Sequence, residues 1–261
     1  MNRFDKEERI IELFQDIDKI QMAIYPQNIK MFILNNLIHN KKKWKYWIDS
    51  SAKDALPPDF YNETKKLMMD VMRIDDHAYV DENGRVINPT NERESKVIEE
   101  IIKKNPAFKK VVEEGNFLLV PDSGLRGEKD HNYTFYINNF KRVVEKHIKK
   151  IPKYQKNHPG YKTIFLVFDE SSPYVKCINN VRPTKIGEKI FAEPHLWWLD
   201  YNMLNILKDS KVDFLLWVTP YKHFDSEEKV ELPHSYLIDV SKINFDKLKK
   251  YEIKDMASLE A

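Results

Sequence analysis

Glycine is scarce in this chain, with six residues among 261. Loops that cradle phosphates need glycine where φ is positive or where the ligand touches the main chain. The densest pair, Gly124 and Gly127 in DSGLRGEKDH, has neither the spacing of a phosphate-binding loop nor a following Lys-Ser/Thr pair. Gly-x-Gly-x-x-Gly does not occur. The sequence therefore implies no nucleotide or flavin cofactor.

Cysteine and long apolar runs are also lacking. Cys177 is the single cysteine, so the chain cannot form an internal disulfide or a cysteine-rich zinc site. This usage fits a reducing compartment, and we expect a cytoplasmic protein. No apolar stretch approaches the length of about 20 residues that spans a bilayer. The first residues, MNRFDKEERI, lack the apolar core of a signal peptide. We expect no membrane partner.

The chain also lacks a large excess of either positive or negative charge. The 43 basic and 41 acidic side chains leave a net charge of +2. Nucleic-acid binding would therefore depend on a local basic patch, since the overall field is nearly neutral. Apolar residues make up 42% and aromatic residues 12% of the chain, which favours a folded protein over a disordered one.

Hydrophobic periodicity predicts alternating helices and strands in the second half of the chain. The helix expected at 133–150 has Phe135, Phe140, Val144 and Ile148 on its inner stripe. The runs TIFLVF and FLLWV are apolar without alternation, as strands buried on both faces are. Helices are expected at 5–22, 27–39, 91–114, 133–150, 194–210 and 241–251, and strands at 66–74, 85–88, 117–120, 163–168, 174–178, 213–218 and 235–240.

This pattern predicts an α/β fold with a mixed, mostly covered β-sheet, helices on both faces and an N-terminal helical extension. We interpret residues 1–261 as a single domain, without an internal repeat or flexible linker. The helical extension would span 1–55, the α/β core 56–240, and a C-terminal helix with a tail 241–261.

An acidic couplet, Asp169 and Glu170, directly follows the apolar strand TIFLVF. Sites in open α/β sheets collect beyond the carboxyl ends of parallel strands. The couplet would suit Mg²⁺ or Mn²⁺ there. Equally, the two acids could end the strand on an exposed turn completed by Ser171, Ser172 and Pro173.

A second acidic cluster begins within the strand expected at 66–74. Asp70 interrupts an apolar run, and a buried unpaired acid costs several kcal/mol. Asp70 should thus be exposed, paired or bound to metal. Asp75, Asp76 and His77 follow the strand, and oxygen ligands with one imidazole suit Mg²⁺ or Mn²⁺ better than zinc. The alternative is a solvated turn.

The stretch PPDFYNETKKLMMDV resembles the PD-(D/E)XK nucleases, over at most residues 58–170. The resemblance implies that Asp59, after Pro58, and Asp70 lie on neighbouring strands, bind a divalent metal and position water. Met72 stands where the family has lysine. Lys66, or a residue on the following helix, is a candidate replacement.

Two stretches interleave lysine with aromatic residues or histidine, as nucleic-acid surfaces do. HNKKKWKYW contains Lys41, Lys42, Lys43 and Trp44, and KRVVEKHIKKIPKYQK contains Lys146, Lys149 and Lys150. The alternative is a pair of solvated helix faces. Under either reading, His147 is expected to be an exposed helix residue.

Two functions from different classes follow from these patterns. The first is a nuclease-like hydrolase that uses Mg²⁺ or Mn²⁺ to cleave nucleic acid. The second is a non-catalytic α/β protein that binds a protein or nucleic-acid partner through its basic, aromatic helices. In the second case every acid named above is structural.

Overall fold

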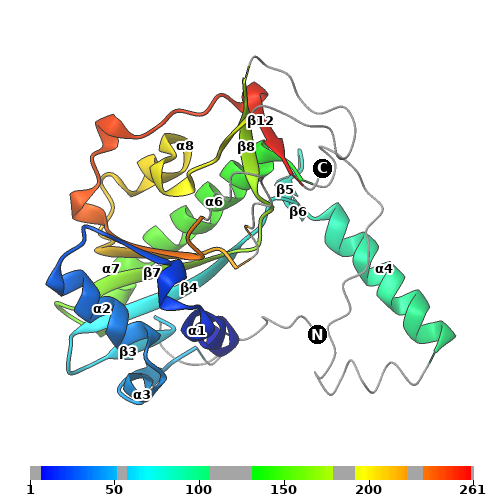
Figure 1. The fold of residues 1–261 in the computed structure, drawn as a ribbon. Helices are drawn as coiled ribbons and strands as arrows, with labels where there is room; N and C mark the ends of the chain where they lie inside the picture. Colours follow the sequence, from blue (N-terminus) through cyan, green and yellow to red (C-terminus); the bar gives the residue numbers. More distant parts are fainter. Residues whose placement is uncertain are drawn as a thin grey trace.

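A computed structural model describes residues 7–51, 58–105, 131–178, 192–220, 222 and 232–259. A seven-stranded mixed sheet lies at its centre, in the order β1-β11-β10-β7-β4-β3-β2 (Figure 1). The predicted mixed α/β fold is confirmed. Its strands are β1 (Met22–Tyr25), β2 (Ile48–Asp49), β3 (Phe60–Asn62), β4 (Leu67–Ile74), β7 (Lys162–Asp169), β10 (Phe214–Val218) and β11 (Ser235–Asp239).

The middle of the sheet is parallel. β7 pairs in parallel with β4 on one side and with β10 on the other. β3 is antiparallel to β4, and β11 is antiparallel to β10. Every residue from Ile164 to Phe168 and from Leu215 to Val218 is fully buried. The two apolar runs are thus covered on both faces, as their lack of alternation predicts.

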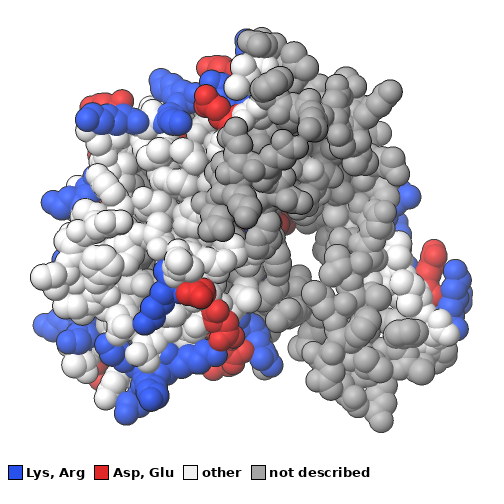
Figure 2. Space-filling model, viewed as in Figure 1, with Lys and Arg blue, Asp and Glu red and all other residues white. Residues whose placement is uncertain are grey.

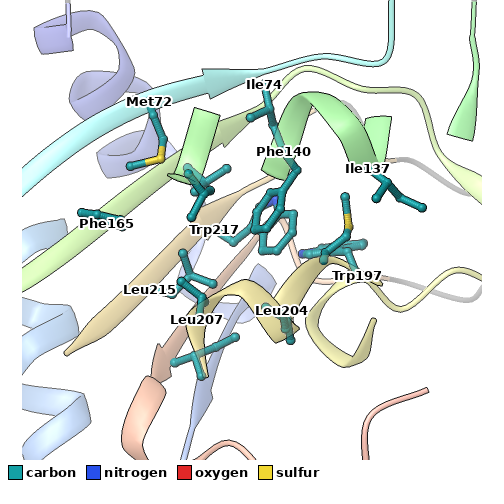
Figure 3. Packing of buried hydrophobic residues seen from close by; sticks show 14 of the residues in the cluster. Met72, Ile74, Ile137, Phe140, Phe165, Trp197, Leu204, Leu207, Leu215 and Trp217 are labelled. Carbon is teal, nitrogen blue, oxygen red and sulfur yellow. The ribbon is translucent and has the colours of Figure 1, made fainter. Parts of the chain in front are cut away.

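One face of the sheet packs against α6 (Tyr133–Ile148) and α7 (Ile151–Asn157). Alternate strand residues such as Met72 and Trp217 point into this layer, since successive strand side chains point to opposite faces. Figure 3 shows Phe140 of α6 beside Trp217, and their ring centroids lie 4.7 Å apart. The short helix α8 (Tyr201–Leu204) completes the layer.

The N-terminal helices cover the opposite face. They are α1 (Glu7–Asp16), α2 (Ile29–His39) and α3 (Lys41–Trp44). The helix predicted at 5–22 ends at Asp16, and Asp18 accepts a hydrogen bond that starts a 3-10 turn. β1 follows and pairs in parallel with β11. Residues 7–51 therefore contribute two strands, β1 and β2, and a helical layer to the core, where the sequence predicts a helical extension.

The prediction of a helix at 241–251 is wrong. That segment forms two 3-10 turns, and β12 (Met256–Ser258) follows in a small sheet with β8 (Tyr174–Cys177) and β9 (Ala192–Pro194). Asp239 and Asn244 each accept a backbone hydrogen bond two residues ahead. Such local bonds compete with helix formation. Asp200 caps Asn202 in the same way and divides the helix predicted at 194–210 into short turns.

In the sequence, the described residues between β4 and α6 form a two-stranded sheet and a longer helix. These are β5 (Tyr79–Val80), β6 (Val86–Ile87) and α4 (Pro89–Lys104), which extends away from the sheet layers in Figure 1. The predicted strand at 117–120 lies outside the described residues. Within the described ranges, no helix is both long and apolar enough to cross a membrane.

We predict that Phe140→Ala lowers the free energy of unfolding by about 3–5 kcal/mol, because it leaves a cavity against Trp217 in the fully buried layer. Urea unfolding monitored by circular dichroism measures the change. Val80→Ala is the control, since Val80 is 50% exposed and should change stability by less than about 0.5 kcal/mol. Equal losses for the two variants would contradict this packing.

Candidate functional site

Asp70 is buried within β4 and contacts the helical layer. Its Oδ2 accepts a hydrogen bond of 2.7 Å from the Tyr154 hydroxyl and contacts His147 Nδ1. Its carboxylate is therefore paired with other side chains. From the sequence, Asp70 is expected to be exposed, paired or bound to metal. The expectation that His147 is exposed is wrong, because 13% of its side chain is accessible. His147 follows Phe140 by seven residues, which returns it to the buried stripe of α6.

Asp59 lies directly before β3 and beside Asp70. Its Oδ2 accepts a 2.7 Å hydrogen bond from the main-chain N–H of Val71. Burial, then the negative charge of Asp70, raise the pKa of Asp59 from 3.8 to about 8, with a smaller contribution from Glu7 of α1. Neighbouring carboxylates resist ionising together. Burial beside Asp70 therefore favours the protonated form of Asp59, and a bound cation would favour the ionised form.

A cavity of about 310 Å³ lies close to Asp70: its lining includes Val71, the next residue of β4, and His147, which contacts Asp70, but neither Asp59 nor Asp70 itself. It lies where β4 continues past its pairing with β3, which ends at Met69. Beyond that residue, the described part of the chain has no other strand on this edge of β4. α1 and α6 form the walls. The lining residues are Glu7, Ile10, Val71, Met72, Arg73, Val143 and His147.

Lys66 does not join this site. It is exposed in the turn before β4, with φ at 49°. It precedes Asp70 by four residues, or roughly 13 Å along an extended chain. Met72 lines the cavity instead, so the basic group that reaches Asp70 is the His147 imidazole.

Asp169 and Glu170 do not converge on one point. The Oδ2 of Asp169 accepts hydrogen bonds from Tyr136 at 2.5 Å and from Trp217 at 2.9 Å. Glu170 pairs with Arg73 at 2.7 Å. Burial nevertheless raises the pKa of Glu170, although Arg73 opposes the shift. The metal-binding couplet predicted from the sequence is therefore divided between two separate sets of partners.

Lys222 neutralises Asp169 and was not predicted. It is 3% exposed, and its Nζ lies 3.4 Å from Asp169 Oδ2. It also donates to Ser171 Oγ at 2.7 Å. A buried acid with a buried lysine forms a structural ion pair whose disruption is costly. Asp169 thus has its charge balanced by the protein itself.

Asp75, Asp76 and His77 follow β4, and the structure separates their roles. Asp75 Oδ1 accepts hydrogen bonds from the main-chain N–H groups of His77 and Ala78, at 3.2 and 3.0 Å. It also accepts one from Asn139 at 2.9 Å. Asp75 therefore stabilises the turn.

Asp76 is fully buried, and its Oδ2 accepts 2.7 Å hydrogen bonds from Ser172 and Tyr174. Burial alone would raise the pKa of Asp76, but hydrogen bonds from His131 and Tyr174 and the nearby His77 hold it well below its usual value. One donor atom each from Asp76, His77 and His131 lie within 4.8 Å of one another, so these residues form a group that could hold a metal ion.

The lysines predicted to bind nucleic acid differ in their surroundings. Lys41 pairs with Asp16 at 2.5 Å, and Lys43 donates to Asn36, whereas Lys42 is exposed. Trp44 stacks on Trp47 with ring centroids 5.1 Å apart and is partly buried. Figure 2 shows basic and acidic side chains intermingled along the lower border, near α1 and α3.

The second basic stretch lies at the end of α6. Lys146 and Lys149 are exposed and Lys150 is partly exposed. No described ion pair engages them. His147, in the last turn of α6 between these lysines, lines the cavity and contacts Asp70.

A larger hollow of about 390 Å³ lies near the start of β7 and β10. Its charged groups pair with one another: Lys30 lies 3.4 Å from Asp239, and Lys162 lies 3.5 Å from Asp213. Because these charges pair with one another, this hollow is a weaker candidate than the cavity close to Asp70.

Comparisons of the chain with protein-family models, with curated proteins and with solved structures give no match.

We predict that Asp59→Asn protects the metal-free protein at alkaline pH. A raised pKa stabilises the folded state below pH 3.8, and this contribution is lost as the pH rises toward about 8. Asparagine keeps the acceptor for Val71 but does not ionise. Between about pH 5 and pH 9, the wild type should lose about 1–3 kcal/mol more stability than the variant. Parallel unfolding curves across this range would contradict the raised pKa.

Proposed function

We propose that this protein is a divalent-metal-dependent hydrolase that cleaves nucleic acid at the cavity beside Asp59 and Asp70. The observation that carries the proposal is the close approach of these two carboxylates, where burial and the charge of Asp70 raise the pKa of Asp59. They lie on neighbouring elements of the sheet, as the resemblance to the PD-(D/E)XK nucleases implies. Within the described residues, no lysine or arginine contact is recorded for this pair.

The donor set fits Mg²⁺ or Mn²⁺. Asp59 and Asp70 would hold the ion, and Glu7 of α1 adds a third carboxylate at the cavity. Carboxylate oxygens are the protein ligands that these hard ions prefer. When bound, the ion supplies an activated water and stabilises charge at the scissile phosphate.

His147 is the residue that we assign to proton transfer. Its ring both contacts Asp70 and lines the cavity. Asp70 orients the imidazole through Nδ1, as a carboxylate orients a general base in other sites. In the resembled family a lysine occupies the strand position held here by Met72. We propose that His147 of α6 replaces it.

Lys146 of α6 and Lys150, which lies in the turn between α6 and α7, are placed to contact the nucleic-acid backbone. Lys146 lies three residues after Val143, and Lys150 lies three residues after His147. Val143 and His147 both line the cavity. Residues three apart are neighbours on a helix surface, so Lys146 lies beside the cavity residue Val143, and Lys150 follows just beyond the end of α6. Lys141 and Lys149 lie two residues from a cavity residue, roughly 200° around the helix.

A specific observation also favours the second candidate function, protein binding. α2 exposes Ile29, Phe32 and Ile33 by 78%, 54% and 58%. Clustered apolar side chains on a surface helix are typical of protein interaction sites. A wide area without charged side chains is visible on this face in Figure 2. Such a surface is compatible with hydrolysis at the cavity close to Asp70.

We predict that the purified protein cleaves DNA or RNA with Mg²⁺ or Mn²⁺ and not with a chelator. Asp70→Asn should lower the rate at least about 100-fold, equivalent to about 3 kcal/mol of transition-state stabilisation. Asp209→Asn removes an exposed acid far from the cavity and is the matched control. Circular dichroism verifies that each variant folds. Cleavage without metal, or undiminished by Asp70→Asn, would disprove the assignment.

We predict that Lys146→Ala with Lys150→Ala weakens nucleic-acid binding more than Lys141→Ala with Lys149→Ala does. Both variants lose two positive charges, so a purely global electrostatic effect would make them equal. The slope of log K against log salt should fall by about 1–2 in the first variant, because each lost phosphate contact removes about one counterion. Equal binding by the two variants, or binding insensitive to salt, would contradict this surface.

A further inference from the structure

We propose that Asp76, His77 and His131 bind one transition-metal ion of the zinc type, at a site separate from the carboxylates that the proposed hydrolase uses. Asp76 lies six residues beyond Asp70, at the far end of β4, or roughly 15–20 Å away. The inference does not depend on the hydrolase proposal, since the two sites share no residue.

The donor spacing suits a tetrahedral ion. Asp76 Oδ1 and His77 Nε2 are 3.5 Å apart. Zinc binds nitrogen and oxygen at about 2.0–2.2 Å, and two tetrahedral ligands at that length lie about 3.4 Å apart. The three donor atoms lie within 4.8 Å of one another, so a side-chain shift of roughly 1 Å would bring them all to bonding distance.

One oxygen of Asp76 is left for a ligand. Oδ1 is buried and accepts no hydrogen bond from the described residues. Oδ2, in contrast, accepts from Ser172 and Tyr174. A buried carboxylate oxygen without a partner costs free energy, which a bound cation would offset. The carboxylate is held firmly by one oxygen while the other faces His77 Nε2.

The ligand types select the metal. Two imidazoles with one carboxylate suit zinc, cobalt or nickel, whereas Mg²⁺ requires a near-octahedral shell of oxygen ligands. The sequence-based expectation of Mg²⁺ or Mn²⁺ here counted Asp75 with Asp76 and a single imidazole. Asp75 is instead engaged by main-chain N–H groups, and His131 supplies the second imidazole.

Solvent reaches the site through its histidines. The side chains of His77 and His131 are 19% and 12% exposed, while Asp76 is fully buried. The ion would therefore enter from the histidine side. It would join the end of β4 to the residue before Asn132, which caps α6. Metal binding to this folded arrangement stabilises the protein by mass action.

Titration of the full chain with ZnCl₂, and separately with CoCl₂, tests the proposal. The wild type should bind one equivalent in calorimetry, in the presence of excess Mg²⁺, with a rise in melting temperature and a visible Co²⁺ spectrum. His77→Gln and His131→Gln should each weaken Zn²⁺ binding at least about 10-fold. Both positions are partly exposed, and far-UV circular dichroism establishes that the metal-free variants fold.

Two control variants identify the site. His158→Gln removes a histidine that caps α7, and Asp70→Asn alters the proposed hydrolase site. Both should retain wild-type Zn²⁺ binding. The proposal is overturned if the wild type binds no Zn²⁺, if His77→Gln and His131→Gln bind it unchanged, or if Asp70→Asn abolishes binding. Retained binding in Asp70→Asn also keeps this result independent of nuclease activity.

Discussion

The burial of the Asp70 carboxylate in the middle of β4 is the constraint around which the candidate site is arranged. Asp70 is 2% exposed on a strand whose other residues are almost all apolar. A charge in that position must be met by polar groups. Tyr154 and His147 come from the helical layer to meet it, and Asp59 comes from the turn before β3. One strand residue thereby fixes how α6, α7 and β3 approach the same point of the sheet.

Charge balance separates the acids of this protein into two kinds. Asp169 has Lys222 within 3.4 Å, and Glu170 has Arg73 within 2.7 Å. These carboxylates complete their pairing within the fold. Asp59 and Asp70 repel each other, and the pKa of Asp59 rises to about 8 through burial and this repulsion. Among the described residues, no hydrogen-bond donor reaches Asp76 Oδ1. A cation is therefore expected where a carboxylate lacks a positively charged partner from the protein, and not simply where acidic residues are numerous.

The sequence predicted the parts of the fold that local patterns determine. β7 and β10 are long apolar runs, and α6 has a regular inner stripe, so both kinds of element were predicted near their observed bounds. β1 was missed because the apolar residues around it continue the spacing of α1. The C-terminal helix was wrongly predicted because Asp239 and Asn244 form local bonds that outcompete it.

The candidate sites are less predictable because they consist of residues that are distant in the sequence and meet only in the folded chain. Asp59 and Asp70 were identified from their resemblance to a nuclease motif, and the fold brings them together. His147 could have been assigned from its place seven residues after Phe140 on α6. No comparable pattern connects Lys222 with Asp169, which are 53 residues apart by their numbering, or His131 with Asp76. Such pairs form only when separate strands and helices pack.

The central claim is that Asp59 and Asp70 share a divalent cation. Its most direct test is anomalous diffraction from crystals of the wild-type protein grown with Mn²⁺. The account predicts an anomalous peak about 2.0–2.6 Å from an oxygen of each carboxylate. The absence of a peak there at saturating Mn²⁺ would contradict it. So would an anomalous peak found only beside Asp76, His77 and His131.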